Sequence, residues 1–388
     1  MTQSISQQLL SQGIGYLSDG TLLPFPLDQR PLIPSRNLGL TATQLGTIIK
    51  AWLQWQKFSK AALSHEHSRI WFRELMTRHS SALWGDYERS ELQQYFKHDD
   101  YFFGPHVTRL DMVIDAQGNP RLLDPNVMPY GISPLVASSQ LLGLSSHHTY
   151  LERLGSYGGT WVADRSHGNA HSLAWLCRIA GLNFQFTDEH TAQERIIRQT
   201  RLPLRGTKAT VNAPGIRTFE SQLWSALISL PGFAQFVGFH ADRQLHKLHA
   251  VPSYLARVED EHLFIASSFT AGQLQHVAFE EFVAMQWAAG FKKVFLKGLY
   301  TSGSHQVTHA EFKQAAILKA VRRKFLLPGD KYFLLQPALP SLHEGERVRL
   351  ATYIGYDGAI FGTELTAVPA ESSISHLGSH ATLSYLVP

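Results

Sequence analysis

The sequence predicts an α/β fold of the α+β type, with both antiparallel and parallel strand pairing. Three stretches carry this prediction: residues 109–126 read as a β-hairpin, residues 160–187 as a βαβ unit, and residues 293–307 as a strand followed by a loop of small residues. A hairpin requires antiparallel pairing, whereas a βαβ unit favours a parallel, Rossmann-like sheet. We therefore expect both kinds of sheet in this chain of 388 residues.

Composition indicates a globular protein with a substantial core. Hydrophobic residues make up 44% of the chain and charged residues 17%, and the formal net charge is +4. The basic residues are scattered, and the densest cluster, Arg322 to Lys324, reads as a solvated helix face. The basic residues form no stripe that could contact a nucleic-acid backbone, so we expect no nucleic-acid partner.

The single cysteine and the hydropathy pattern bear on the compartment. Cys177 has no second cysteine to pair with, which suits a reducing compartment, and its apolar helical surroundings indicate a buried structural thiol. No apolar run reaches the roughly 18 residues of a membrane span. The N-terminus lacks the basic and apolar regions of a secretion signal. We expect a cytoplasmic protein with no membrane partner, and the oligomeric state stays open, a dimer included.

The chain begins with a segment of no clear period, broken by proline and glycine up to about residue 40. Thr41 and Gln44 then form a predicted capping box that opens a helix. The predicted buried face of this helix carries five apolar residues: Leu45, Ile48, Ile49, Trp52 and Leu53. Helical pattern continues around Ile70 and again around Leu92.

The hairpin that follows reads as strand, turn, strand, with the turn at residues 115–120. Folding the segment about that turn places Asp111 opposite Asp124 and Arg109 opposite Asn126. Because side chains alternate across a strand, these four share one face. The other face then carries the apolar residues of the hairpin: Leu110, Met112, Ile114 and Leu123.

The polar face of this hairpin is unusual for a surface turn. Turn chemistry alone would account for Asp115 and Gly118. It would not account for Asp111 and Asp124 placed directly opposite each other, because like charges in that position repel. Two carboxylates with an amide, Asn126, and an arginine beside them are suited to a hard cation that carries an anion. We therefore interpret the hairpin as a cation-binding site.

The middle of the chain carries the βαβ pattern. Thr160–Asp164 reads as a buried strand, His171–Ala180 as a helix ended by Gly181, and Asn183–Thr187 as a second strand. A further strand is expected at Ala209–Asn212. The unit lacks the Gly-x-Gly-x-x-Gly turn, so the sequence does not indicate dinucleotide binding.

The last third begins with an apolar strand that ends at Lys297 and leads into a loop of small residues. Backbone N–H groups in such a loop, beside a lysine ammonium, can hold phosphate oxygens. Its small residues are Ser302, Gly303 and Ser304. Two more strands are expected, Tyr332–Gln336, which meets Pro337, and Glu346–Tyr353, which leads to a turn at residues 357–358.

Together these motifs resemble those of a known superfamily. Residues 109–131 read Arg-Leu-Asp-x3-Asp-x2-Gly-x3-Leu-Leu-Asp-Pro-Asn-x2-Pro-x-Gly, which is similar to the metal-binding hairpin of ATP-grasp ligases such as D-alanine–D-alanine ligase. The strand of Lys297 resembles their phosphate-binding strand, and Tyr332–Gln336 resembles the hinge strand beside adenine. In ordinary members the lysine strand precedes the hairpin, whereas here it follows. The chain thus resembles a circularly permuted ATP-grasp protein, and nearby termini make such permutation easy.

The resemblance implies three segments. Residues 1–145 would hold N-terminal helices and the metal hairpin, residues 146–270 a pre-ATP-grasp-like α/β module, and residues 271–388 the nucleotide-binding strands. Four residues depart from the superfamily pattern. Asp124 stands where glutamate is usual, Gly298 where proline is frequent, and Gln336 where glutamate is common, and Tyr130 separates Pro129 from Gly131.

The resemblance also implies the roles of individual residues. The metal ligands would be Asp111, Asp124 and Asn126, holding two Mg²⁺ ions, or Mn²⁺, against the ATP phosphates. Arg109 would stabilise the transferring phosphoryl group or the acyl phosphate, and Arg349 would reach the acceptor carboxylate or the γ-phosphate. The remaining nucleotide contacts implied are Lys297 and Lys247 to phosphates, the loop of Ser302, Gly303 and Ser304, Gln336 and Ala338 at adenine, and Glu346 or Glu344 at ribose.

The function implied is an ATP-dependent carboxylate–amine ligase that forms an amide or peptide bond through an acyl phosphate. Its partners would be a small carboxylate and an amine, either of them free or tethered to a carrier or peptide. Two alternatives stay open: a phosphotransferase that moves the γ-phosphate to a hydroxyl, and a non-catalytic nucleotide-binding protein. The 20 histidines show no zinc-site spacing, and no Gly-x-Ser-x-Gly motif indicates a serine hydrolase.

Overall fold

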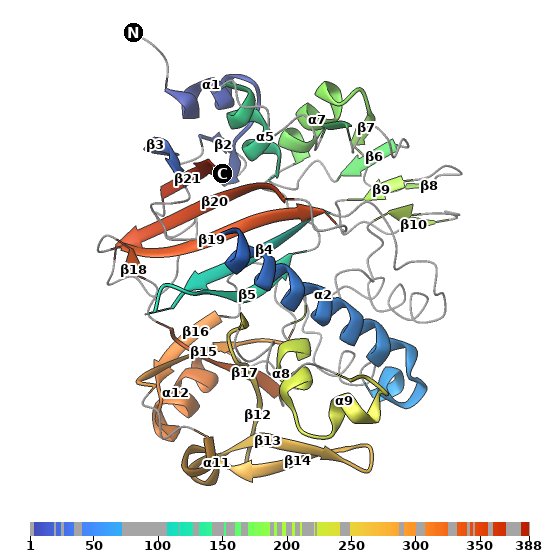
Figure 1. Ribbon diagram of the computed structural model, residues 1–388, viewed down its shortest axis with the longest axis vertical. Helices are drawn as coiled ribbons and strands as arrows, with labels where there is room; N and C mark the ends of the chain where they lie inside the picture. Colours follow the sequence, from blue (N-terminus) through green and yellow to red (C-terminus); the bar gives the residue numbers. More distant parts are fainter. Residues whose placement is uncertain are drawn as a thin grey trace.

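The structure is a computed structural model with two large, mainly antiparallel sheets and a smaller parallel sheet to one side (Figure 1). It describes residues 4–18, 21–24, 27–34, 41–71, 107–115, 117–126, 132–141, 151–152, 160–163, 170–186, 190–191, 196–198, 204–205, 210–211, 221, 223–240, 249–286, 291–299, 307–324, 332–339, 342–343, 346–355, 360–369 and 382–387. Mixed helix and sheet with antiparallel pairing agrees with the predicted α+β class.

The first sheet, here the hairpin sheet, has the strand order β3-β21-β20-β19-β4-β5. Its strands are β3 Leu27–Pro34, β21 Thr382–Val387, β20 Ile360–Pro369, β19 Glu346–Gly355, β4 Val107–Ile114 and β5 Pro120–Asn126, and β18 Leu342–His343 pairs with β19. All neighbours are antiparallel except β21 and β3. The predicted hairpin, β4 and β5, therefore lies beside a strand that follows it by more than two hundred residues.

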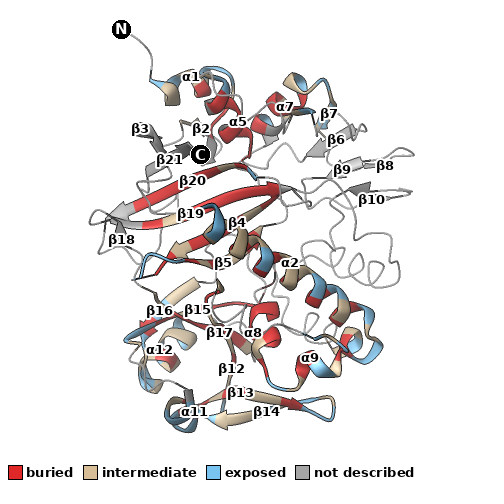
Figure 2. Cartoon of the chain, in the orientation of Figure 1, coloured by how far each residue is buried: buried red, intermediate tan, exposed pale blue. Residues whose placement is uncertain are grey.

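Helix α2, Ala42–Ser64, covers the apolar face of the hairpin sheet (Figures 1 and 2). The predicted capping box is confirmed, and Ile48 and Trp52 are buried as expected. The other three predicted residues, Leu45, Ile49 and Leu53, are only half-buried, and the buried stripe continues instead through Trp55 and Phe58. The aromatic residues of this helix thus share one buried apolar cluster with Leu110 and Met112 of β4 and with Leu122 of β5.

The capping box should contribute measurably to stability. Gln44 N–H donates to the Thr41 hydroxyl at 3.2 Å, and the Gln44 side-chain oxygen accepts from Thr41 N–H at 2.8 Å. We expect Thr41→Ala to lower the free energy of unfolding by about 1 kcal/mol, measured by urea denaturation. The control is Thr47→Ala in the second turn of the same helix, where the hydroxyl donates to the carbonyl of Thr43 in the preceding turn. Equal losses in the two variants would contradict the capping role.

The second sheet, here the lysine sheet, is antiparallel throughout, with the order β14-β13-β12-β17-β15-β16. Its strands are β12 Tyr254–Glu259, β13 His262–Thr270, β14 Gln273–Ala278, β15 Lys293–Lys297, β16 Val307–Glu311 and β17 Tyr332–Pro337. Its outer face packs on α11 Phe279–Gln286 and α12 Gln314–Lys324. Arg322 and Arg323 are exposed on α12, as predicted for the basic cluster.

The predicted βαβ unit is present in the parallel sheet, whose order is β11-β9-β6-β7. Its elements are β6 Thr160–Ala163, α7 Ala170–Ile179, β7 Asn183–Phe186, β9 Ile196–Arg198 and β11 Thr210–Val211. Gly181 adopts a φ of +68° after α7, and the N–H of Leu182 donates to the Cys177 carbonyl at 2.8 Å. This is the glycine-dependent helix end that the sequence indicated.

The other described elements are short. They are α1 Ile5–Ser11, β1 Tyr16–Ser18, β2 Thr21–Leu23, α5 Ile132–Leu141, β8 His190–Thr191, β10 Leu204–Arg205, α8 Leu223–Ser229 and α9 Phe233–Phe236. Helices α1, α5 and α7 share an apolar cluster with Tyr353 and Phe361 of the hairpin sheet. Among the described helices, none is both long and apolar enough to span a membrane.

Cys177 is fully buried in that cluster, and burial raises the pKa of its thiol. The thiolate is the reactive form, so the folded protein should react with iodoacetamide at least about 100-fold more slowly than the unfolded chain. Mass spectrometry of labelling with and without urea measures this ratio. Labelling of the folded protein at the unfolded rate would contradict the buried structural role.

Candidate active site

The predicted register of the hairpin is confirmed. Arg109 pairs with Asn126 and Asp111 with Asp124. The register then shifts between Asp111 and Met112, so that Met112 pairs with Leu122. This bulge corrects one expectation: Leu122 takes the buried position on the apolar face, whereas Leu123, which we predicted there, is only half-buried.

The turn holds this register through local hydrogen bonds. The Asp115 carboxylate accepts from the Asn119 N–H and the Arg121 Nε, both at 2.8 Å, and from the Gln117 N–H at 3.0 Å. Burial opposes these contacts, but together they lower the pKa of Asp115. Gly118 adopts a φ of +79°, which few other residues tolerate. Asp115 and Gly118 thus stabilise the turn, as the sequence predicted.

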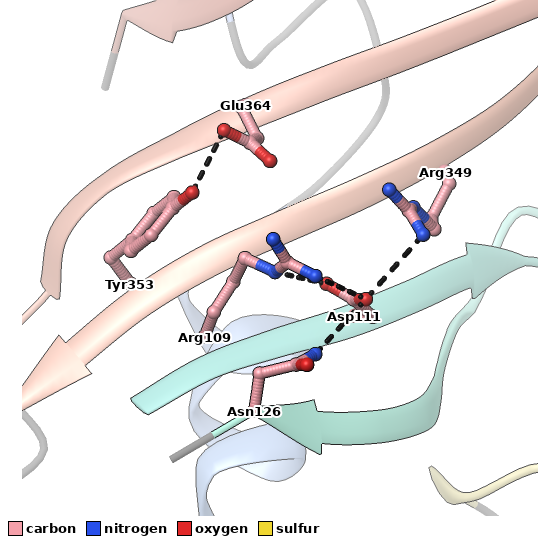
Figure 3. Close-up of polar contacts among 6 residues, drawn as sticks. All are labelled: Arg109, Asp111, Asn126, Arg349, Tyr353 and Glu364. Atoms are coloured by element: carbon pink, nitrogen blue, oxygen red, sulfur yellow. Dashed lines mark hydrogen bonds and ion pairs between the residues drawn. The ribbon is translucent and has the colours of Figure 1, made fainter. Parts of the chain in front are cut away.

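Asp111 is the centre of the polar cluster (Figure 3). Arg109 contacts it with two nitrogens, Nε to Oδ1 at 2.8 Å and Nη2 to Oδ2 at 3.0 Å. The Asn126 Nδ2 donates to the same Oδ2 at 3.2 Å, and the Arg349 Nη1 lies 3.6 Å from it. Asp111 is only 1% exposed, so these cations and the amide take the place of water around the carboxylate.

Electrostatics on this face keep Arg109 charged. Burial alone would lower its pKa, but the neighbouring Asp111 carboxylate, with Tyr353 and Glu364, raises it well above the ordinary value. The site therefore offers a permanent cation directly beside the paired carboxylates.

Lys297 comes to the same place from the lysine sheet. It is the last residue of β15 and is 7% exposed. The pKa of Lys297 is lowered, because burial outweighs the opposing effect of the Asp124 and Asp111 carboxylates. The pKa of Asp124 is raised, because burial outweighs the opposing effect of the Lys297 ammonium. These mutual effects place the ammonium within electrostatic reach of the hairpin carboxylates. The structure thus brings Arg109, Asp111, Asp124, Asn126 and Lys297 together from two sheets.

Gln336 shares the face of the lysine sheet that carries Lys297, since Phe295 pairs with Gln336 in the antiparallel ladder. It is 1% exposed, its Nε2 donates to the Ser253 hydroxyl at 3.1 Å, and its Oε1 is buried with no partner among the described residues. The Ala338 N–H donates to the Lys293 carbonyl at 3.0 Å. The Ala338 N–H is therefore not free to donate to adenine, so a contact of Ala338 with the base could use only its carbonyl or its side chain.

Several predicted nucleotide contacts are not described. Glu346 lies in β19, but only its backbone is placed. The predicted contacts outside the described residues are Lys247, Ser302, Gly303, Ser304 and Glu344.

Sequence reasoning missed Glu364 and Tyr353. Glu364 is 6% exposed in β20 and its Oε2 accepts from the Tyr353 hydroxyl at 2.8 Å (Figure 3). Burial raises the pKa of Glu364, whereas Arg109 and Arg349 lower it. A signal was present, because Glu364 is the single charged residue in the apolar stretch 360–369.

The donor set of the site suits a hard cation. Asp111, Asp124 and Asn126 offer carboxylate and amide oxygens, the ligand types that Mg²⁺ prefers. In the part of the chain that the structure describes, there is no group of three or more His, Cys, Asp or Glu side chains that could hold a metal ion. A metal at the hairpin would therefore need further oxygen ligands from a nucleotide or from water.

Comparisons with known proteins add little to this picture. Neither a scan against protein-family models nor a search of curated proteins found a match. A search of solved structures found a crystal structure of a candidate gamma-glutamylcysteine synthetase from Methylobacillus flagellatus KT. That chain is 12% identical, with a TM-score of 0.45 over 79% of this chain and 88% of its own. Similarity at this level does not establish a shared fold or activity.

Proposed function

We propose that the protein is an ATP-dependent carboxylate–amine ligase with a circularly permuted ATP-grasp fold. The observation that carries this proposal is the convergence of Lys297, from one sheet, on the paired carboxylates Asp111 and Asp124 of the other. A buried ammonium near one buried and one half-buried carboxylate, with two guanidinium groups beside them, suits a polyphosphate with its metal ions.

The chain order supports the permutation. The hairpin, β4 and β5, precedes the lysine strand β15 by more than 150 residues, yet β4 pairs with β19, which follows the hinge strand β17. The N-terminal and C-terminal parts of the chain thus complete one sheet. The three segments 1–145, 146–270 and 271–388 stay a prediction, and the site draws strands from the first and the last.

Asp111, Asp124 and Asn126 would hold Mg²⁺, which when bound neutralises phosphate charge. Lys297, Arg109 and Arg349 would contact the phosphate oxygens and align the γ-phosphoryl group. A substrate carboxylate attacks the γ-phosphorus, and ADP leaves, giving an acyl phosphate. An amine then attacks the acyl carbon, phosphate leaves, and the amide forms. The protein's own work is alignment and charge balance, so no protein nucleophile is needed.

Gln336 supports a nucleotide in particular. Its Oε1 is a buried acceptor without a partner among the described residues, and a buried polar atom left unpaired costs about 1–3 kcal/mol. The exocyclic amine of adenine would supply the missing donor. The Ala338 N–H is already used by the sheet, so recognition of the base at this position would rest on the Gln336 side chain.

The test is ADP release with ATP and Mg²⁺ across a panel of carboxylic acids and amines, with hydroxylamine replacing the amine in a second series. A ligase should trap its acyl phosphate as a hydroxamate. A phosphotransferase should instead release ADP with hydroxyl acceptors and form no hydroxamate. ATP binding without turnover on any pair would favour a non-catalytic protein, and no ATP binding at all would refute the proposal.

Asp124→Ala tests the placement of the site. We expect at least a 100-fold loss of ADP release, on the order of what removal of a metal or oxyanion contact costs. The matched control is Asp115→Asn in the turn of the same hairpin, which should keep activity within about threefold because Asp115 contacts only the turn and Arg121 among the described residues. Full activity of Asp124→Ala would place the chemistry elsewhere.

A further inference from the structure

Glu364 is a buried carboxylate to which the mechanism above gives no task. It lies in the middle of β20, on the face of the hairpin sheet that carries Asp111, and Tyr353 holds its Oε2 (Figure 3). Both Arg109 and Arg349 act on its charge, so the two guanidinium groups lie within electrostatic reach. Helix α5 and its apolar neighbours pack around Tyr353 and keep this corner dry.

Ala351 separates Glu364 from Asp111 on this face. The register pairs Ala351 with Asp111 on one side and with Glu364 on the other. Neighbouring strands lie about 4.8 Å apart, so the Cα atoms of Asp111 and Glu364 are two strand spacings, roughly 10 Å, apart along one row. Only a methyl group lies between them in that row. A guanidinium above this methyl group can therefore approach either carboxylate by side-chain rotation.

In the contacts observed, Asp111 has little capacity left for a metal ion. Both of its oxygens accept from Arg109, and Oδ2 also accepts from Asn126 and faces Arg349. A carboxylate offers about four lone-pair sites, and these partners use nearly all of them. A divalent cation at Asp111 would also repel the guanidinium of Arg109. For Asp111 to ligate a metal, Arg109 has to move.

We propose that Glu364, held by Tyr353, is the positioning residue that receives Arg109 when Asp111 turns to the metal. This inference rests on the proposed function, because it concerns the state with metal and nucleotide bound. Arg109 keeps a carboxylate partner in both states, so the exchange never leaves this half-buried cation unpaired. In the second state its guanidinium is aimed from the Glu364 side at the phosphates.

The experiment measures binding of Mn²⁺ in the presence of ADP by calorimetry, which needs no turnover. Glu364→Gln keeps the volume and can still accept from the Tyr353 hydroxyl, but it has no charge to attract Arg109. We expect its Mn²⁺ affinity to fall about 10-fold or more, as for other residues that support metal ligands. Tyr353→Phe, which loosens the carboxylate without removing it, should weaken Mn²⁺ binding by a smaller factor.

Thr363→Val is the matched control. Thr363 is the neighbour of Glu364 on β20, is 8% exposed, and points to the other face, where its hydroxyl lies 3.0 Å from that of Thr352. It should lower the melting temperature, as we also expect of Tyr353→Phe, but leave the Mn²⁺ affinity unchanged. A drop in Mn²⁺ affinity with Thr363→Val equal to that with Glu364→Gln would mean general loosening and would overturn the inference.

A double-mutant cycle shows whether Glu364 acts through Arg109. In an Arg109→Lys background, whose shorter side chain should not span the two carboxylates, Glu364→Gln should have little further effect on Mn²⁺. If Glu364→Gln weakens Mn²⁺ binding as much in the Arg109→Lys background as in the wild type, Glu364 does not act through Arg109. If the wild type and Glu364→Gln bind Mn²⁺ with ADP equally tightly, the inference about Glu364 is refuted but the proposed function is not. If the wild type binds neither Mn²⁺ with ADP nor ATP, the proposed function itself is refuted.

Discussion

Arg109→Ala is expected to lower the free energy of unfolding by about 3–5 kcal/mol, because it removes the two-nitrogen partner of a buried carboxylate. Asp111 is 1% exposed, and its remaining contacts are the single Asn126 bond and the 3.6 Å approach of Arg349. Urea denaturation measures the loss. Under the proposed function the same variant should also abolish ATP turnover, since Arg109 contacts Asp111 with two nitrogens.

The control for Arg109→Ala is Arg322→Ala. Arg322 also makes a 2.8 Å ion pair, with Glu261, but the two side chains are 56% and 80% exposed. Its removal should change stability by less than about 1 kcal/mol. Adding Asp111→Asn to Arg109→Ala should recover part of the lost stability, because it removes the unpaired charge, but it should not recover activity. Equal losses in the two arginine variants would show that Asp111 is not effectively buried.

The hairpin was predictable from sequence because its determinants are local. Asp115 and Gly118 specify the turn, and with strand alternation they place Asp111 opposite Asp124 without any knowledge of the rest of the fold. The capping box of α2 and the glycine end of α7 were predictable for the same reason. The β-bulge was not predicted. It shifts the register between Asp111 and Met112, so that Leu122 and not Leu123 is buried, and no turn residue in the sequence indicates it.

Glu364 and Tyr353 could not be placed from sequence because their neighbours are non-local. Their relation to Asp111 depends on β19 lying between β4 and β20, and nothing in the sequence specifies that order. Lys297 was predicted from a resemblance, and its position beside Asp124 follows only from how the two sheets lie relative to each other. A lone charged residue in an apolar strand, such as Glu364, is the kind of signal that becomes readable once strand order is known.

Lys297→Met is expected to reduce kcat/KM for ATP by about 100- to 1,000-fold while leaving stability within roughly 2 kcal/mol of the wild type. The two effects separate because the cost of burying the ammonium outweighs its attraction to Asp124 and Asp111, so removal of the charge costs the fold little. Steady-state kinetics and urea denaturation measure them. Lys293→Met, at the exposed start of the same strand, is the control and should change neither. A large stability loss with intact kinetics would make Lys297 a structural counter-ion only.

The pH dependence of stability gives an independent check on the burial of Lys297. Burial lowers its pKa from the ordinary value of 10.5, so in alkaline solution the folded protein binds fewer protons than the unfolded chain. Stability contributed by this group therefore rises with pH up to about 10.5 and is lost as the pH falls through the lowered pKa. Relative to Lys297→Met, the wild type should gain free energy of unfolding between neutral and alkaline pH. A constant difference between the two proteins would mean that the ammonium is solvated, and the site would then lack the dry, preorganised cation on which the proposed chemistry depends.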